Sequence, residues 1–529
     1  MKRLLFSVCM LAALPVMAQE TYQNATVVAE DLNGTARYVG MGGAMEALGA
    51  DISTIATNPA GIGLFRSSSV NATASVVAQG DAKDIDKGNK TMMSFDQIGF
   101  VVAHRTDGGG FLNFGFNYHK SRNFNQILTA ANKLGNGSQN ILSYANGMST
   151  GKLDAEEEDG HYYPVFNGNY PLYYSQLDEL YNQALNFDPN DGYYYSYAAS
   201  DFNFARAQKG YIGEYDFNIS GNIKDRVYLG LTLGIHDVHY RSYTNYMENL
   251  MYSSGEGFGS VNLNDERKIT GTGYDIKAGI IVRPIEESAF RIGASVASPI
   301  FYDLKTYNYT KLNNNSKEGA YDWSDNEETY EFRLNTPWKF GLSLGHTVGN
   351  YLALGASYEY AGYDHIDSRE KGDEYYDFYY DSYYSSSASD DNMNDHTEAT
   401  LKGVSTLKLG IEYKPIPEIA FRAGYNYVSP MYNEHGMKEY ADQYVNSLGT
   451  SYTSTTDYTN WKATHRLTLG VGYNFKGFSA DLAYQYNTTK GDFYPFQEKF
   501  SNEFDSSYCS ATKVDYNRHQ FMLTLGYRF

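Results

Sequence analysis

Residues 36–65 read ARYVGMGGAMEALGADISTIATNPAGIGLF, and this apolar, glycine-rich stretch precedes every segment that resembles a β-strand. Its second half predicts short helices joined by turns. Gly49 suits the left-handed residue that ends a helical turn, and Asp51 is expected to cap residues 52–56. The order NPAG at 58–61 predicts a type I turn. Such a short segment cannot form a core alone, so it is either a helical cap on a soluble domain or a plug enclosed by another structure.

The N-terminus has the layout of a secretory signal peptide. A charged pair, an apolar run and a small-residue site follow one another within residues 1–18. We therefore expect the mature chain to begin at Gln19, with Cys509 as its only cysteine. A single cysteine allows neither an internal disulfide nor a cysteine metal cluster.

The composition favours a membrane barrel. The 529 residues include 52 Tyr and 50 Gly but only 12 Pro, and the mean hydropathy is −0.51. High tyrosine and glycine with weak average hydropathy is typical of strands that meet lipid on one face and water on the other. The formal charge of −20 argues against nucleic acid as a partner, because a phosphate-binding surface needs an excess of Lys and Arg.

Alternation of apolar and polar residues continues from the plug to the C-terminus. Residues 226–240, for example, alternate Val, Leu and Ile with Tyr, Gly, Thr and His. This pattern predicts strands with one apolar and one polar face. The strands that we expect are residues 68–78, 95–104, 111–120, 210–221, 226–240, 270–283, 289–297, 336–347, 351–362, 401–414, 419–428, 464–475, 477–487 and 519–529.

The connections between these strands alternate between short and long. Turns such as 222–225 alternate with long polar stretches such as 121–209. A soluble sandwich also has alternating strands, but short turns at one end and long loops at the other are typical of outer-membrane barrels with extracellular loops. We therefore predict an all-β fold, a transmembrane antiparallel β-barrel of about 14 strands formed by residues 67–529. Trp338 and Trp461 are expected in its lipid-facing aromatic girdle.

The last strand supports the same interpretation. One of its faces carries Phe521, Leu523, Leu525, Tyr527 and Phe529. This resembles the C-terminal strand of bacterial outer-membrane barrels, which ends in an aromatic residue recognised by the assembly machinery. We expect Phe529 to be that signal.

A barrel of this size is too wide for its own side chains to fill, so residues 19–66 are expected to plug the lumen. The apolar residues of the plug are also the candidates for ligand contact. They are Met41, Met45, Leu48, Ile52, Ile55, Ile62 and Leu64.

The plug resembles the N-terminal hatch of the FadL/TodX family of outer-membrane channels for hydrophobic compounds, and we use the name hatch for residues 19–66. In that family a glycine-rich stretch with an acidic residue and a serine leads into Asn-Pro-Ala. The matching residues are Gly42, Gly43, Asp51, Ser53, Asn58, Pro59 and Ala60. The match covers only the hatch, and the strand count and the terminal Phe529 agree with it.

The resemblance implies diffusion of long-chain fatty acids or other hydrophobic molecules. The cargo would be captured among extracellular loops, held beneath the hatch and released sideways through a gap at the third strand, here residues 111–120. Gly115 is the candidate for that gap, because glycine weakens a strand; alternatively it is a small residue facing a crowded plug. The polar inward faces and the length of stretch 121–209 depart from the simplest version of this scheme.

Other clusters have simple interpretations. His236 and His239 could suggest metal or haem ligation, but residues i and i+3 of a strand point to opposite faces, which favours a position at the rim. The acidic, tyrosine-rich tract 373–384 could bind Ca²⁺ or a protein partner, although a solvated loop is the simpler explanation. The sequence offers no nucleophile elbow, zinc motif or catalytic triad on a recognisable scaffold. We expect no enzyme activity, no metal and no cofactor.

The leading hypothesis is therefore a monomeric outer-membrane channel, surrounded by lipid, that takes up hydrophobic small molecules and is gated by its hatch. A non-transporting surface or secretion-system scaffold on the same barrel is the alternative, motivated by the long acidic loops. A porin for polar solutes is a third hypothesis, which stable conductance of the intact protein would support.

Overall fold

The computed structural model describes residues 20–106, 109–166, 174–377, 379, 382–439, 445–498, 507 and 509–529. The expected signal peptide, residues 1–18, lies outside these ranges. Among the described residues no helix is both long and apolar enough to cross a membrane.

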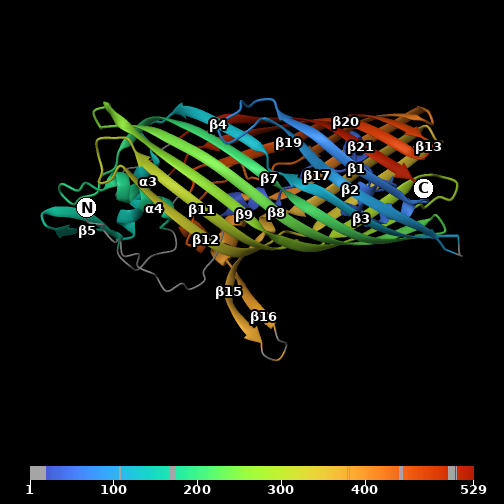
Figure 1. The fold of residues 1–529 in the computed structure, drawn as a ribbon, viewed down its shortest axis with the longest axis horizontal. Coiled ribbons are helices and arrows are strands. Elements are labelled where there is room, and N and C mark those ends of the chain that lie inside the picture. Colours follow the sequence, from blue (N-terminus) through green and yellow to red (C-terminus); the bar gives the residue numbers. More distant parts are fainter. Residues whose placement is uncertain are drawn as a thin grey trace.

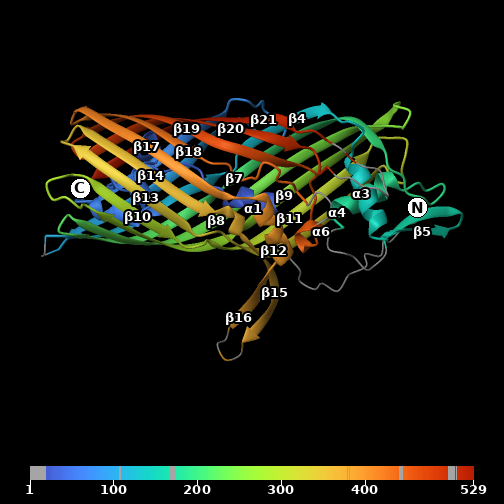
Figure 2. The same ribbon diagram turned by 180° about the vertical axis from the view of Figure 1, so that it is seen from behind.

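The strands close into a barrel of 14 antiparallel positions (Figures 1 and 2). Closure is made by β1 (Ser69–Gln79), which pairs with β2 (Thr91–Arg105) on one side and with the last strand, β21 (Thr512–Arg528), on the other. Each of the expected strands overlaps one of the observed strands. The others, in order around the wall, are β3 (Phe111–Asn123) with β4 (Gln126–Lys133), β7 (Ala198–Ile223), β8 (Val227–Met251), β9 (Gly257–Val282), β10 (Arg291–Ala297) with β11 (Phe301–Asn314), β12 (Trp323–Asn335) with β13 (Lys339–Val348), β14 (Leu352–Gly362), β17 (Gly403–Ile416), β18 (Ile419–Val428), β19 (Tyr458–Phe475) and β20 (Phe478–Tyr494).

The two faces of the wall differ as a transmembrane barrel requires. On β8, Leu229 and Leu231 point outward and are 45% and 50% exposed, whereas Thr232 points inward and is buried. A soluble sandwich would bury the apolar face instead. The exposed apolar belt therefore identifies a surface that contacts lipid, and the lumen is polar.

The wall is longer than a bilayer requires. β7, β8 and β9 contain 26, 25 and 26 residues, whereas about 10 tilted residues cross the hydrocarbon core. The prediction that residues 121–209 form a loop is therefore wrong in part, because β4 and the first half of β7 extend the wall. The rest of that stretch folds into α3 (Gln139–Ser149), the hairpin of β5 (Leu153–Glu158) and β6 (His161–Phe166), α4 (Gln176–Tyr181) and the π-helix η3 (Asn182–Asn186).

These helices gather at the barrel end opposite the C-terminus (Figure 1). Their apolar side chains form one core with the ends of the long strands, including Leu177, Tyr181, Phe202, Tyr246 and Phe493. We call this structure the cap. α6 (Leu448–Ser451) lies near the cap (Figure 2). α5 (Asp391–Thr400) contacts α1 (Thr21–Val28) of the N-terminal segment and η4 (Tyr363–His365), while the hairpin of β15 (Asp367–Asp377) and β16 (Ser382–Ser389) projects away from the wall (Figures 1 and 2).

The hatch folds into four short helices inside the barrel. They are α1 (Thr21–Val28), α2 (Ala36–Gly40) and the 3-10 helices η1 (Ile52–Ala56) and η2 (Pro59–Leu64). α2 contacts β18 to β21, whereas η2 contacts β3 and β7 to β9, so the hatch reaches opposite parts of the wall and fills the bore.

Candidate ligand site

The glycines of the hatch motif lie where the hatch backbone meets the wall. Gly42 and Gly43 have φ of +64° and +82°, a region that favours glycine. A Cβ on Gly42 would lie 2.8 Å from the backbone N of Tyr425. Glycines of the wall complete the contact, because Gly410 and Gly424 leave room for the backbone around Met41 and Gly42.

Asp51 and Ser53 connect two parts of the hatch. Asp51 caps η1, as predicted, by accepting a hydrogen bond from the Ser53 amide at 3.0 Å. It also accepts from the Thr35 hydroxyl at 2.9 Å, while Ser53 Oγ accepts from the Thr35 amide at 2.8 Å. The two motif residues therefore hold the segment before α2 against η1.

The Asn-Pro-Ala corner is fixed to the wall. Asn58 Oδ1 accepts from the Ala60 amide at 3.2 Å, and the expected tight turn continues as η2. The Pro59 carbonyl accepts from the Ser220 hydroxyl at 2.9 Å, and Asn113 Nδ2 donates to the carbonyl of Ile62 at 2.7 Å. Polar side chains on the inward faces of β3 and β7 thus donate hydrogen bonds to carbonyl groups of the hatch.

Buried ion pairs also hold the hatch. Arg37 pairs with Glu412 on β17 at 3.1 Å, and the same carboxylate pairs with Arg422 on β18 at 2.6 Å. On the same side, Glu46 pairs with Lys408 at 2.8 Å. These pairs cross from hatch to wall, so moving the whole hatch would expose several buried charges.

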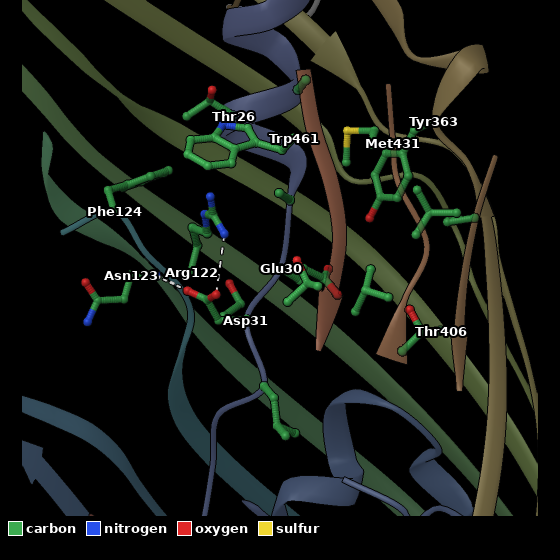
Figure 3. A pocket seen from close by; sticks show the side chains of 18 of the residues that line it. Thr26, Glu30, Asp31, Arg122, Asn123, Phe124, Tyr363, Thr406, Met431 and Trp461 are labelled. Carbon is green, nitrogen blue, oxygen red and sulfur yellow. Dashed lines mark hydrogen bonds and ion pairs between the residues drawn. The ribbon is translucent and has the colours of Figure 1, made fainter. Parts of the chain in front are cut away.

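A cavity of about 330 Å³ lies between the hatch and the wall; we call it the lumen cavity. Apolar and aromatic side chains on its lining include Tyr22, Phe124, Tyr363, Met431 and Trp461, four of which Figure 3 labels. The prediction of a lipid-facing girdle position is therefore wrong for Trp461, which lies at a register shift in β19 and turns inward. Trp338 is exposed beside β13.

None of the seven apolar hatch candidates lines the lumen cavity. Six of them, all but Leu64, are buried in the core that the hatch forms with itself and the wall. Their expected role in ligand contact stays a prediction, and the residues on the cavity lining are different ones. The seven are Met41, Met45, Leu48, Ile52, Ile55, Ile62 and Leu64.

Three arginines lie near one carboxylate in the lumen cavity, and two of them bond to it. Asp31 accepts from Arg122 at 3.4 Å and from the Asn123 amide at 2.9 Å (Figure 3), and it also accepts from Arg518 at 3.3 Å. Burial alone would raise the pKa of Asp31, but attraction to Arg518, Arg122 and Arg466 outweighs it and holds that pKa well below its usual range. The Nε atoms of all three arginines are buried without a hydrogen-bond partner among the described residues.

The pairing of β3 is interrupted next to this carboxylate. The β2–β3 ladder stops at Gln97 and His119, and the β3–β7 register shifts between Lys120 and Arg122. The hatch covers the interruption, since the Asp31 amide donates to the Ser121 carbonyl at 2.9 Å. In the same way, Asn33 Nδ2 donates to the Lys120 carbonyl at 3.0 Å.

Gly115 does not mark this interruption. It pairs with Val101 on β2 and with Asn218 on β7, and a Cβ on it would lie 3.3 Å from Ile55 of the hatch. The pairing on both sides contradicts the expected gap at Gly115 and agrees with the alternative, a small residue facing the crowded hatch.

Of the remaining sequence candidates, His236 lines the lumen cavity, whereas His239 and Phe529 do not. The side chains of His236 and His239 are 1% and 46% exposed, so they face opposite sides of β8 as predicted; a rim position is wrong, because β8 continues to Met251. Tract 373–384 falls largely on side chains outside those described. Phe529 is exposed, with its amide bonded to the Ser68 carbonyl.

The closed wall, the apolar outer face and the internal hatch together define a plugged transmembrane β-barrel.

Neither family models nor curated protein sequences match the chain. Among solved structures, a Pseudomonas aeruginosa FadL homologue matches 94% of this chain and 99% of its own, with 13% identity and a TM-score of 0.50. The Ralstonia pickettii toluene transporter TbuX also matches, over 94% of this chain and 99% of its own, with 12% identity and a TM-score of 0.46. The first of these confirms, for the fold, the resemblance to the FadL/TodX family.

Proposed function

We propose that this protein is an outer-membrane channel that takes up hydrophobic small molecules, including long-chain fatty acids, without a catalytic step. The observation that carries the proposal is a barrel with a lipid-type outer face whose lumen is blocked by a hatch, with a cavity between hatch and wall. An apolar solute gains about 25 cal/mol for each Å² that leaves water, so such a cavity gives it a resting place on its way across the membrane.

The lining of the lumen cavity suits an amphipathic cargo. Aromatic and apolar side chains would hold the hydrocarbon part. Arg122, Arg466 and Arg518 carry three positive charges against the single negative charge of Asp31, and the net charge of +2 favours an anionic group in the cavity. A fatty-acid carboxylate is such a group, and charge-assisted hydrogen bonds to arginine are among the stronger ones.

The interruption in β3 is the proposed exit. Beyond the pair Gln97 and His119, β2 and β3 are no longer paired with each other. The hatch residues Asp31 and Asn33 cover this break. A cargo carboxylate that competes with Asp31 for the arginines would weaken this cover. The route would then open sideways towards lipid while the ion pairs of Arg37 and Glu46 keep the rest of the hatch in place.

The proposal places the cap and the long loops outside the cell and the short turns in the periplasm. Phe529 would guide assembly into the outer membrane, and one chain would suffice for transport, because the cavity is built by a single barrel.

The test is uptake of radiolabelled oleate by a bacterial strain that lacks its own transporter. We expect the wild-type protein to restore uptake, and mass spectrometry of the purified barrel to detect co-purified fatty acid. Asn58→Ala removes the cap of η2, typically about 1 kcal/mol, and Pro59→Ala loosens the same turn. Both variants should lower uptake while the folded barrel still migrates faster than the heated one in electrophoresis. Unchanged uptake in both would contradict gating by the hatch.

A further inference from the structure

A second group of charged side chains lies on the inward faces of four neighbouring strands. Strand pairing places His119 of β3 beside Glu214 of β7, and Glu214 beside His236 of β8. Asp216 follows Glu214 by two residues on β7 and therefore lies on the same inward face. The group is completed by Asp275 and Lys277 of β9, and all six side chains are buried.

The charges within this group do not balance. Lys277 Nζ lies 3.2 Å from both Asp216 Oδ1 and Asp275 Oδ2 and also pairs with Glu214. Three carboxylates against one ammonium leave a charge of −2 when both histidines are neutral. A buried charge without compensation costs several kcal/mol, so the group calls for further positive charge.

The arrangement of nitrogen and oxygen atoms fits a metal ion. One ligand atom from each of His119, Glu214 and Asp216 can be chosen so that all three lie within 4.8 Å of one another. His119 Nε2 is 3.5 Å from Glu214 Oε2, and His119 Nδ1 is 3.4 Å from Asp216 Oδ2. Ligands at tetrahedral positions around Zn²⁺ are about 3.3 Å apart. An imidazole offers one nitrogen to an ion, so a shift of the ring or of one carboxylate must bring the three ligand atoms, which lie within 4.8 Å of one another, to that spacing.

Two buried atoms of the group lack hydrogen-bond partners among the described residues. They are Asp216 Oδ2 and His236 Nδ1. Gly234 of β8 lies between Asp216 and Asp275 in the pairing, and a Cβ there would overlap the Asp275 carboxylate and lie 3.0 Å from Lys277 Nζ. The absence of that side chain leaves the space in which the charged groups meet.

The group is open to the lumen cavity. His119, Glu214, His236, Asp275 and Lys277 all belong to its lining. An ion can therefore enter from the cavity, and the flexible side chain of Lys277 has space to withdraw into it.

We propose that His119, Glu214 and Asp216 form a binding site for a divalent transition-metal ion of the Zn²⁺ class. Lys277 occupies the place of the ion and withdraws when it binds. A divalent charge added to the net −2 of the group gives neutrality, with Lys277 still nearby. An imidazole with carboxylates favours Zn²⁺ and its neighbours over Ca²⁺ and Mg²⁺, which prefer oxygen ligands alone. The inference does not depend on the cargo, since binding is measured on the purified barrel.

The test is isothermal titration of the full chain in detergent, stripped with EDTA and purified without a polyhistidine tag. With ZnCl₂ we expect one ion per chain, and with CaCl₂ an affinity at least tenfold weaker. His119→Ala and Glu214→Gln should each weaken Zn²⁺ binding at least tenfold. Lys277→Met should strengthen it at least tenfold, because the competing ammonium is removed.

The matched control is His239→Ala, which removes an exposed histidine that pairs with Asp237 on the outward face of the same strand as His236. It should bind Zn²⁺ like the wild type. Heat-dependent mobility in electrophoresis shows that each variant is folded. The proposal is overturned if the wild type binds no Zn²⁺, if His119→Ala and Glu214→Gln both bind like the wild type, or if His239→Ala abolishes binding. Should a variant not fold, the Lys277→Met result decides, and equal or weaker binding overturns the site.

Discussion

Arg122 of β3 and Arg518 of β21 bond to Asp31, and Arg466 of β19 adds a third positive charge near this carboxylate. Arg466 donates to Asn426 at 3.0 Å and to the Glu30 carbonyl at 3.3 Å, while its Nε is buried without a hydrogen-bond partner among the described residues. An acceptor that enters the cavity would satisfy this buried donor and lower the free energy of the complex. Substitution of these arginines therefore tests cargo selectivity.

Arg466→Gln should therefore discriminate between carboxylate and uncharged cargo. A hydrogen bond to a charged group contributes about 1.5–3 kcal/mol, so binding of oleate should weaken about tenfold or more. Binding of oleyl alcohol should change little, because it carries no charge. Fluorescence displacement on the purified barrel measures both. Arg241→Gln is the control, as this arginine is exposed and pairs with Glu266; equal losses for acid and alcohol would argue against a carboxylate site.

His396 connects the first helix of the hatch to α5. Its Nδ1 lies 2.9 Å from the hydroxyl of Thr21, and burial lowers the pKa of His396 to about 4. The undocked form of α1 would leave this histidine exposed, with its usual pKa near 6.5. A proton then binds the undocked form first, so docking of α1 is fully stable above about pH 6.5 and weakens as the pH falls towards 4.

Hydrogen exchange of the α1 amides should show this pH dependence. Protection is expected to fall between pH 6.5 and pH 4, by up to roughly 3 kcal/mol of docking free energy. His396→Gln should remove most of the change, whereas replacement of the exposed His435 should not. A pH-independent exchange rate in the wild type, after correction for intrinsic exchange, would contradict the assignment.

At the scale of elements, the hatch and the wall fit through glycines. Gly424 of β18 faces the amide of Gly42 so closely that any Cβ would overlap it, and Gly410 of β17 faces the Met41 carbonyl in the same way. Gly410 and Gly424 therefore mark places where the wall contacts the backbone of the hatch. Cβ-bearing residues would hold hatch and wall apart.

Gly424→Val should displace the hatch without preventing barrel assembly. We expect the variant to form a folded barrel with stable single-channel conductance in planar bilayers, and we expect only brief openings from the wild type. Gly221→Val is the matched control, since a Cβ at Gly221 of β7 meets no atom within 4 Å. If the Gly424 variant had a conductance as low as that of the control, the added side chain would not have moved the hatch out of the lumen.

The strands and the hatch were predictable from local patterns, and the extensions of the wall were not. In β8 the leucines Leu229, Leu231 and Leu233 face lipid, so the alternation is plain. Beyond the membrane the pattern inverts: Phe202 and Phe204 of β7 point inward to the cap core, and Asn203 points to water. Helices and turns within 121–209 interrupt the pattern further, which is why this stretch reads as a loop. Asp51 and Asn58 were predictable because capping is local.

At the scale of the whole molecule, the site depends on strand register, which a single sequence does not specify. Arg122 and Arg518 are separated by most of the chain and become neighbours only when β21 closes against β1. The same holds for His119 and Glu214, which a pairing of β3 with β7 brings together. The sequence pattern predicts that polar residues point inward. Which of these side chains become neighbours depends on the register of the strands in the closed barrel.

Closure also defines two alternative routes, straight through the lumen or sideways at β3, and a reversible cross-link separates them. The Asp31 amide donates to the Ser121 carbonyl at 2.9 Å, which places two cysteines at these positions within the range that a disulfide spans, on the order of 5–6 Å between Cα atoms. In a Cys509→Ser background, the oxidised pair Asp31→Cys and Ser121→Cys should lock the hatch over the break and abolish oleate uptake. A reducing agent should restore uptake to the level of the two single variants. The cross-link leaves the hatch helices in place. Uptake that persists after complete oxidation would therefore exclude the sideways route and require a passage past α2 and η2. In that region the ion pairs of Arg37 and Glu46 hold the hatch to the wall.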